Sequence, residues 1–252
     1  MNSIKKMMLS GALGCLISGM AYADGSSPQP VKPYWQDIQV VAVNKEKPRS
    51  SFMSYADRET ALTSRFEKSP YYSLLNGTWK FFFVDSYKDL PQNITDPSVN
   101  TSSWDDITVP GNWEVQGHGV AIYTNHGYEF KPRNPQPPLL PEANPVGVYR
   151  RDIEIPASWD NRDIYLHIGG AKSGLYVYLN GKEVGYSEDS KNPAEFLINK
   201  YLQPGKNVLT LKIFRWSTGS YLECQDFWRM SGIERDVFLW SQPKASIQDF
   251  RV

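Results

Sequence analysis

The sequence predicts an all-β fold arranged as an antiparallel β-sandwich. Short runs rich in β-branched and aromatic residues recur between residues 149 and 240, with turn residues about every 8–12 positions. No segment with helical spacing is as long as about 12 residues, and the best one, 196–202, is short. Aromatic residues make up 13% and charged residues 21% of the 252, which excludes a disordered chain and a coiled coil.

The N-terminus has the pattern of a secretory signal peptide over residues 1–23. Two lysines at positions 5 and 6 precede an apolar run over 7–20 and an A-x-A cleavage site at 21–23. The run is shorter than the roughly 20 apolar residues that span a bilayer. We therefore expect no membrane span and an exported bacterial protein, periplasmic or secreted. A less favoured alternative is a lipid anchor on Cys15, because 12–15 faintly resembles a lipoprotein cleavage site.

The mature chain is close to neutral and contains one cysteine. The 27 basic and 27 acidic residues become 25 and 27 once the signal is lost. This balance predicts no polyanion-binding surface, so we expect no nucleic-acid partner. Cys224 is the sole cysteine after the signal, which rules out an intrachain disulfide in the mature chain. We expect its thiol to be a small buried group rather than a reactive one.

The first part of the mature chain predicts few regular elements. Residues 24–34 are rich in Ser and Pro and are expected to form a linker. Residues 35–55 lack a steady hydrophobic period, which favours an extended arm laid on the domain, and 57–67 has the character of one or two helical turns. Strands are expected at 78–84, which is aromatic, and at 107–109.

A proline-rich segment follows. Six prolines lie within residues 131–147. Since proline has no N–H and fixes φ, this density predicts a long loop. Long loops in compact domains are usually functional or disordered.

The strand pattern becomes regular after this loop. Asn180-Gly181 lies between two β-rich runs and is the strongest signal for a two-residue hairpin turn. Residues 246–252 alternate apolar and polar like the start of a further strand, so the chain looks cut within its next element. The strands expected before it are 149–155, 163–168, 175–179, 182–186, 207–216 and 236–240.

One long motif carries a family resemblance. Residues 215–237, RWSTGSYLECQDFWRMSGIERDV, closely resemble the signature of glycoside hydrolase family 2 β-galactosidases. Shorter matching segments lie in family order: LNGTW at 75–79, VPGNW at 109–113, IYTN at 122–125, NPVGVY at 144–149 and DSKNPAEF at 189–196. The resemblance spans about 35–252, and a motif set this long and ordered is highly specific.

The resemblance implies a domain organisation. Residues 35–243 are similar to the family's N-terminal sugar-binding domain, a jelly-roll sandwich of the galactose-binding-domain type. Residues 244–252 look like the first strand of the immunoglobulin-like domain that follows it. The family's catalytic (β/α)₈ barrel comes next and carries both glutamates of a retaining mechanism. Neither glutamate is in this sequence, so we expect the 252-residue chain alone to be inactive. If full-length, the protein is expected to be a homo-oligomer.

The resemblance also implies two site residues. Asn125 is similar to an asparagine that reaches the galactose pocket. Asp226 is similar to an aspartate that binds a sugar hydroxyl and a sodium ion, whose other ligands come from the barrel. A carboxylate can serve hydroxyl donors and a hard cation together. The intact family enzyme uses sodium and magnesium, and none is expected to bind tightly to this chain alone.

The sequence departs from the family pattern near these residues. Thr218 and Cys224 stand where the family commonly has Asp, and Glu129 follows Tyr128 where the family has Tyr-Pro. Because these acids are absent, the resemblance supports the metal site less strongly than it supports membership of the family.

Simpler roles stay open for the same residues. Asp226 could cap backbone N–H groups, and Asn125 could be an ordinary turn residue. An acid/base pair of Glu223 and Asp226 is disfavoured, because their spacing in a loop fixes no geometry. Four nearby aromatic residues could stack on a sugar or, more commonly, fill the core: Trp216, Tyr221, Phe227 and Trp228. The histidines show no spacing typical of a zinc site: His118, His126 and His167.

The favoured interpretation is the sugar-binding domain of an exported retaining β-galactosidase, whose ligand is a β-galactoside or a galactose-containing glycan. A stand-alone carbohydrate-binding module or an inactive remnant is the alternative from another class. A third possibility keeps the family and changes the sugar, to glucuronic acid or mannose.

Overall fold

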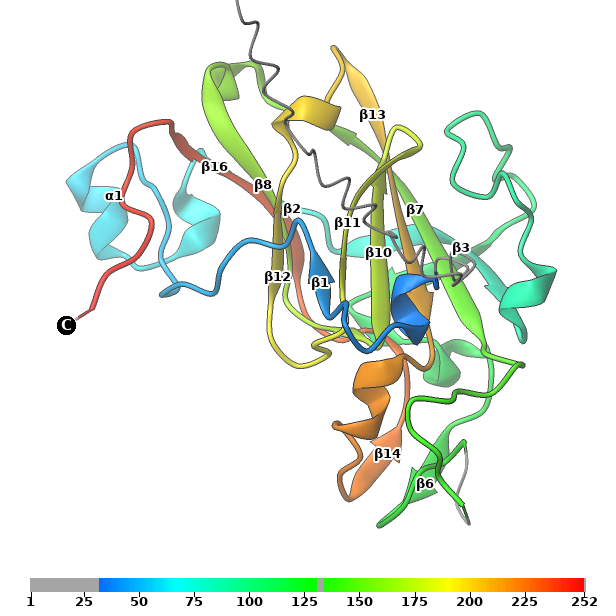
Figure 1. Ribbon diagram of the computed structural model, residues 1–252. Helices are drawn as coiled ribbons and strands as arrows, with labels where there is room; N and C mark the ends of the chain where they lie inside the picture. Colours follow the sequence, from blue (N-terminus) through cyan, green and yellow to red (C-terminus); the bar gives the residue numbers. More distant parts are fainter. Residues whose placement is uncertain (1–31, 131–133, 252) are drawn as a thin grey trace, which may run out of the picture. The chain divides into compact units, whose positions relative to one another are not determined.

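The computed structural model describes residues 32–130 and 134–251 (Figure 1). The compact unit that contains them begins at Lys32. The predicted signal peptide and all but the last three residues of the predicted linker lie outside the described residues. Among the described residues, no helix is long and apolar enough to cross a membrane.

Two antiparallel sheets form a jelly-roll β-sandwich, as predicted. The larger has the order β1-β11-β10-β13-β7-β3-β4 and the smaller the order β12-β8-β16-β2. The strands of the larger sheet are β1 Ala42–Val43, β11 Lys182–Ser187, β10 Gly174–Leu179, β13 Lys206–Phe214, β7 Val146–Glu154, β3 Gly77–Val84 and β4 Asp105–Val109. Those of the smaller are β12 Ala194–Leu197, β8 Arg162–Ile168, β16 Val237–Pro243 and β2 Tyr72–Leu74.

Short elements complete the fold. A two-stranded ladder joins β6 Ile122–Thr124 to β14 Phe227–Arg229, and a small sheet joins β5 Gly111–Asn112, β15 Gly232–Ile233 and β9 Ala171–Lys172. The helix α1, Arg58–Leu62, begins after Asp57, whose Oδ1 accepts from Thr60 N at 2.7 Å. The 3₁₀ turns are η1 Tyr34–Gln36, η2 Phe66–Lys68, η3 Tyr87–Asp89, η4 Glu114–Gln116, η5 Ala157–Trp159, η6 Asn199–Tyr201 and η7 Thr218–Tyr221.

The core lies between the two sheets and contains residues that alternate along each strand. Each large apolar side chain buried there contributes about 1.5–3 kcal/mol. The hairpin turn between β10 and β11 has the backbone that its sequence predicts, with φ of 52° at Asn180 and 77° at Gly181. Core residues from facing strands include Trp79, Phe81, Leu166, Leu211 and Leu239.

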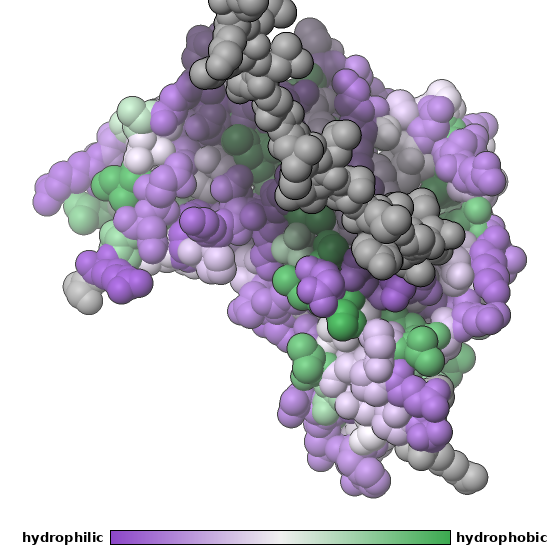
Figure 2. Space-filling view, in the orientation of Figure 1, coloured by the Kyte–Doolittle hydropathy of each residue, from purple (hydrophilic) through white to green (hydrophobic). Residues whose placement is uncertain are grey.

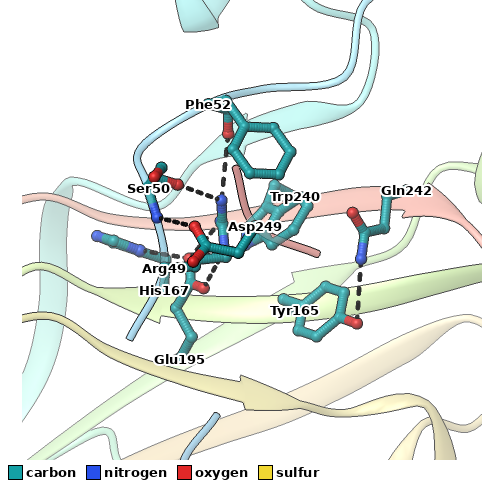
Figure 3. Close-up of polar contacts among 9 residues, drawn as sticks. All are labelled: Arg49, Ser50, Phe52, Tyr165, His167, Glu195, Trp240, Gln242 and Asp249. Atoms are coloured by element: carbon teal, nitrogen blue, oxygen red, sulfur yellow. Dashed lines mark hydrogen bonds and ion pairs between the residues drawn. The ribbon is translucent and has the colours of Figure 1, made fainter. Parts of the chain in front are cut away.

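The outer face of the smaller sheet is also buried. Tyr165 on β8 and Trp240 on β16 stack at 4.5 Å beneath the arm, the blue segment of Figure 1. Arg49 of the arm forms a bidentate pair with Glu195 on β12, with both nitrogen–oxygen distances at 2.9 Å (Figure 3). His167 Nδ1 lies 2.8 Å from the same carboxylate. The extended arm predicted over 35–55 therefore covers a sheet face that the strand pattern alone leaves open.

Three details differ from the sequence prediction. Phe196 and Leu197, in the segment with the best helical spacing, belong to strand β12, because pairing with β8 outweighs a weak local preference. Strand β7 begins at Val146, inside the segment predicted as loop. Residues 246–251 form no strand; Asp249 Oδ1 instead accepts from Ser50 N at 2.8 Å. The assignment of 244–252 to a following domain remains a prediction.

Candidate functional site

The predicted site residues lie in a small lobe beside the sandwich. We call residues 122–130 and 218–229 the β6–β14 lobe; its strands are labelled near the bottom of Figure 1. The ladder pairs Phe227 with Thr124 and Trp228 with Tyr123. Asn125 follows the last paired residue of β6, and Asp226 precedes the first of β14. Antiparallel pairing therefore brings the two predicted residues to the same end of the ladder.

Asp226 is an exposed carboxylate held by a neighbouring strand. Tyr123 Oη donates to Asp226 Oδ1 at 2.9 Å, and this hydrogen bond raises the pKa of the Tyr123 hydroxyl. Among the described residues no backbone N–H donates to Asp226, so the alternative role of Asp226 as a cap is wrong. One oxygen is fixed by the tyrosine, and the carboxylate keeps acceptor capacity for an incoming hydroxyl group.

Asn125 is also exposed. Its Oδ1 lies 2.7 Å from His126 Nδ1, and Thr124 Oγ1 donates to the His126 carbonyl at 2.6 Å. These contacts define the orientation of the loop directly after β6. The Asn125 side-chain nitrogen has no hydrogen-bond partner among the described residues, which leaves it able to donate.

The aromatic residues of the motif do not fill the core. Trp228 is 54% and Tyr123 56% exposed, and their rings lie 5.7 Å apart. Trp216 and Tyr221 are half-buried and pack on Phe130 at 5.5 and 5.2 Å. In Figure 2 the lobe is pale at its centre and hydrophilic along its lower edges, with apolar patches near the place where it meets the sandwich. The core interpretation is therefore wrong for Trp228, because β14 pairs with β6 and not with a sandwich strand.

A buried ion pair supports the lobe from below. Arg229 Nε lies 3.7 Å from Glu129 Oε2, with both side chains almost fully buried, and Trp216 Nε1 donates to Glu129 Oε1 at 2.9 Å. Arg229 Nε and Nη1 nevertheless have no hydrogen-bond partner among the described residues. Glu129 therefore ties the loop after β6 to β14 and to the start of the motif.

A second buried pair fixes the base of the lobe. Arg215 Nη1 lies 3.5 Å from Glu114 Oε1, and its Nη2 donates to the carbonyls of Val120 and Arg229 at 2.9 and 3.0 Å. Burial raises the pKa of Glu114 despite hydrogen bonds from Ser231 N and the charge of Arg215. The pair joins the segments that enter and leave the lobe.

Glu188 holds η7. Its buried carboxylate accepts from Thr218 Oγ1 at 2.9 Å, Gly219 N at 2.6 Å and Tyr186 Oη at 2.7 Å. Burial raises the pKa of Glu188, because hydrogen bonds from neutral donors only partly offset the desolvation. Thr218, where the family commonly has Asp, thus donates to a neighbouring glutamate.

The remaining motif residues have separate partners. Glu223 accepts from Ser190 N at 2.8 Å while Asp226 accepts from Tyr123, so the two carboxylates share no partner. Cys224 is half-buried and its Sγ donates to the Gly127 carbonyl, so the prediction of a buried thiol is wrong. Burial raises the pKa of this thiol.

The lobe can supply only part of a cation site. Within residues 32–130 and 134–251, no group of three or more His, Cys, Asp or Glu side chains could hold a metal ion. A hard cation takes about six oxygen ligands or more, and Asp226 offers one carboxylate. Its chemistry suits sodium, but the described residues do not complete a coordination shell.

Several supporting residues escaped the sequence analysis. Glu114, Glu129 and Glu188 hold the lobe through partners 30 or more positions away in the sequence. Glu129 alone gave a signal, as a departure from the family's Tyr-Pro. Burial and distant pairing decide the other two, and neither can be recognised from local sequence.

The fold and the site together define a β-sandwich domain with an exposed polar and aromatic lobe. A family model described as "Glycosyl hydrolases family 2, sugar binding domain" matches residues 72–243. The chain belongs to this family, and its sandwich is the family's sugar-binding domain.

Curated relatives named β-galactosidase resemble the chain closely. The protein from Priestia megaterium is 41% identical over 87% of this chain and 22% of its own length. The protein from Psychromonas ingrahamii is 39% identical over 86% of this chain and 21% of its own length. The chain thus spans about a fifth of the length of these relatives.

Solved structures share the fold. The crystal structure of Bacteroides uniformis β-glucuronidase matches with a TM-score of 0.52 at 24% identity, over 68% of this chain and 18% of the other. The Bifidobacterium dentium β-glucuronidase complex matches with a TM-score of 0.52 at 19% identity, over 68% and 30%. At these identities the likeness concerns the fold alone.

Proposed function

We propose that this chain is the sugar-binding part of a retaining β-galactosidase, and that Asn125 and Asp226 contribute to its galactose pocket. The observation that carries the proposal is their position at the same exposed end of the β6–β14 ladder. The relatives named β-galactosidase, at 41% and 39% identity, support galactose over glucuronic acid or mannose.

The chemistry of the lobe suits a sugar. The Asp226 carboxylate, oriented by Tyr123, accepts hydrogen bonds from sugar hydroxyls, and the Asn125 amide both donates and accepts. The exposed Tyr123 and Trp228 rings offer faces for the apolar side of a pyranose ring. Bond cleavage needs two further carboxylates in the retaining arrangement, and in this proposal they lie outside this chain. Asp226 supplies one sodium ligand there; no residue of this chain is assigned to magnesium.

The proposal includes location and assembly. A signal peptide over 1–23 directs the protein out of the cytoplasm, to the periplasm or the medium, and the complete protein is a homo-oligomer. Cleavage after residue 23 leaves Cys15 without a role in anchoring; mass spectrometry of the exported protein distinguishes the two processing sites.

A chimera tests the activity. Residues 35–243 would replace the matching segment of the Priestia megaterium β-galactosidase, and hydrolysis of aryl galactoside and aryl glucuronide would be measured. We expect galactoside hydrolysis, lowered about 10- to 100-fold in kcat/KM by Asp226→Asn, which replaces a charged acceptor with a neutral one, or by Asn125→Ala, which removes a hydrogen bond to substrate. Glu67→Gln, on the exposed surface, is the control. A folded chimera that prefers the glucuronide, or is indifferent to Asp226→Asn, contradicts the proposal.

The exposed Trp228–Tyr123 pair favours a second candidate, a carbohydrate-binding module that acts alone. Titration of the 252-residue chain with galactose and lactose separates the two. Millimolar or tighter binding at the lobe supports the module. Weak or absent binding supports a pocket that needs groups from outside this chain.

A further inference from the structure

A hollow lies on the smaller sheet, away from the lobe. It has a volume of about 370 Å³, within the range of small-molecule sites. Its walls are the arm, residues 45–53, and the segment 189–195, and its floor includes His167 and Phe238. It shares no residue with the β6–β14 lobe. We call it the arm hollow.

One nitrogen of His167 is available at the floor of the arm hollow. The Glu195 carboxylate accepts from both Arg49 nitrogens at 2.9 Å and from Trp240 Nε1 at 3.1 Å. Burial alone would raise the pKa of Glu195, but hydrogen bonds from His167 and Arg49 outweigh it and lower the pKa. The ionised carboxylate can only accept, so His167 Nδ1 carries the proton and donates.

The other His167 nitrogen, Nε2, is then an acceptor in the neutral ring. Figure 3 shows it on the side of the ring away from Glu195. It has no hydrogen-bond partner among the described residues. Stacking on Phe238, with centroids 4.1 Å apart, fixes the plane of the ring. The hollow therefore has an oriented acceptor at its floor that no side chain of the described structure uses.

The walls combine aromatic rings with polar groups of both signs. Phe52 and Phe66 are half-buried and line the hollow. Asn192 and Asp189 are exposed on the opposite wall, where Asn192 Nδ2 donates to Asp189 Oδ2 at 2.9 Å. Rings beside amide and carboxylate groups match a ligand with an apolar face and a rim of hydroxyls.

The charge balance selects among ligand classes. Lys45, Glu46 and Lys47 of the arm and Asp189 of the other wall all line the hollow, so both signs of charge are present, and Arg49 is neutralised by Glu195. An anionic ligand would be repelled by the carboxylates, and a cationic ligand would be repelled by the lysines. A neutral polyol suffers neither repulsion and can both donate and accept at the same groups.

We propose that the arm hollow is a second carbohydrate site, which binds a neutral oligosaccharide independently of the lobe. The ligand accepts from Asn192, donates to His167 Nε2 and packs a ring face on Phe52. The domain would thereby bind a long glycan at a place distinct from the proposed galactose pocket. This second-site proposal does not depend on the β-galactosidase proposal.

Amide chemical shifts of the ¹⁵N-labelled full chain test the site, with lactose and β-1,4-galactotetraose as probes. We expect shifts in 45–53, 167 and 189–195 with millimolar affinity, stronger for the tetrasaccharide. Phe52→Ala, Asn192→Ala and His167→Asn each weaken binding about tenfold or less; the last keeps a donor to Glu195 and removes the Nε2 acceptor. Trp228→Ala in the lobe is the matched control and leaves the shifts in the arm hollow unchanged.

Each result decides the proposal. Asn192 is exposed, so its variant separates loss of binding from loss of folding. Shifts confined to 122–126 and 226–228 overturn the second site and leave the lobe as the sugar site. Absence of shifts in the arm hollow with both probes also overturns the second site. The chimera assay tests the β-galactosidase proposal separately.

Discussion

The arm-covered face of the smaller sheet and the β6–β14 lobe are both rich in aromatic and charged residues, but they satisfy those charges differently. On the arm-covered face, Glu195 accepts from Arg49, His167 and Trp240 at 2.8–3.1 Å. In the lobe, Arg229 and Glu129 lie 3.7 Å apart, and two guanidinium nitrogens have no partner among the described residues.

The Glu195 carboxylate on the arm-covered face therefore has a structural role, beside the hollow proposed there, whereas the exposed side chains of the lobe have a binding role. A buried carboxylate that accepts from several donors contributes stability and resists change, because its removal would leave those donors without their acceptor. The lobe places Asp226 and Trp228 in solvent, where they contribute little to folding and are free to meet a ligand. The following predictions test that division, in order of expected effect.

Glu195→Ala tests the arm-covered face. Removal of the carboxylate leaves the half-buried Arg49 uncompensated and Trp240 Nε1 without its acceptor, so we expect a loss of about 3–5 kcal/mol in the free energy of unfolding, measured by urea titration. The surface pair of Lys206 with Asp152 is the control, and Asp152→Ala is expected to cost about 1 kcal/mol or less. Equal costs for the two variants would contradict the division.

Glu129→Gln tests the support beneath the lobe. The amide can still accept from Trp216, but the buried Arg229 loses its counter-charge. We expect a loss of about 1–3 kcal/mol, smaller than at Glu195 because the original pair is longer and incompletely hydrogen-bonded. Urea unfolding of Glu129→Gln and Glu195→Ala under one condition measures the order, and a reversed order would show that the ion pair of the lobe contributes more stability than the Glu195 cluster.

The pH dependence of stability distinguishes two buried glutamates. The pKa of Glu195 is lowered in the fold, so its contribution is present above the ordinary value of 4.5 and is lost as pH falls through the folded pKa. The pKa of Glu188 is raised, so its contribution is greatest below 4.5 and is lost as pH rises through the folded pKa. In a plot of stability against pH, Glu195→Gln should flatten the rise at acid pH, and Glu188→Gln should flatten the fall at higher pH, each relative to wild type. Thermal unfolding between pH 3 and 8 measures the change in slope that each variant causes. Changes of the same sign would refute the opposite pKa shifts assigned to the two glutamates.

Trp228→Ala should have the smallest effect on folding. Its side chain is 54% exposed and packs mainly on Tyr123, so the free energy of unfolding should change by about 0.5 kcal/mol or less. Trp79→Ala, in the core, is the contrast and should cost about 3–5 kcal/mol. Guanidinium unfolding followed by circular dichroism avoids the loss of tryptophan fluorescence. A large cost for Trp228→Ala would mean that the lobe is part of the folding core.

Much of the sandwich could be predicted from the sequence. Asn180-Gly181 requires positive φ at two successive residues, and the structure has the turn there. Apolar and polar residues alternate along β10 and β13, and a strand is the conformation that places such alternating apolar residues on one buried face. The family resemblance also placed Asn125 and Asp226 at one site, and the β6–β14 pairing brings them to one end of a ladder.

The tertiary structure alone decided which charges are buried and what they meet. Glu195 looks like any strand glutamate in the sequence, yet its partner Arg49 lies 146 positions away in the arm. Glu129 and Arg229 are also remote from each other in sequence, and Trp228, expected in the core, is exposed because its strand pairs outside the sandwich. Periodicity and turn chemistry are local and can be recognised in a single chain. Burial and charge pairing depend on which distant segments pack together, and the folded chain settles them.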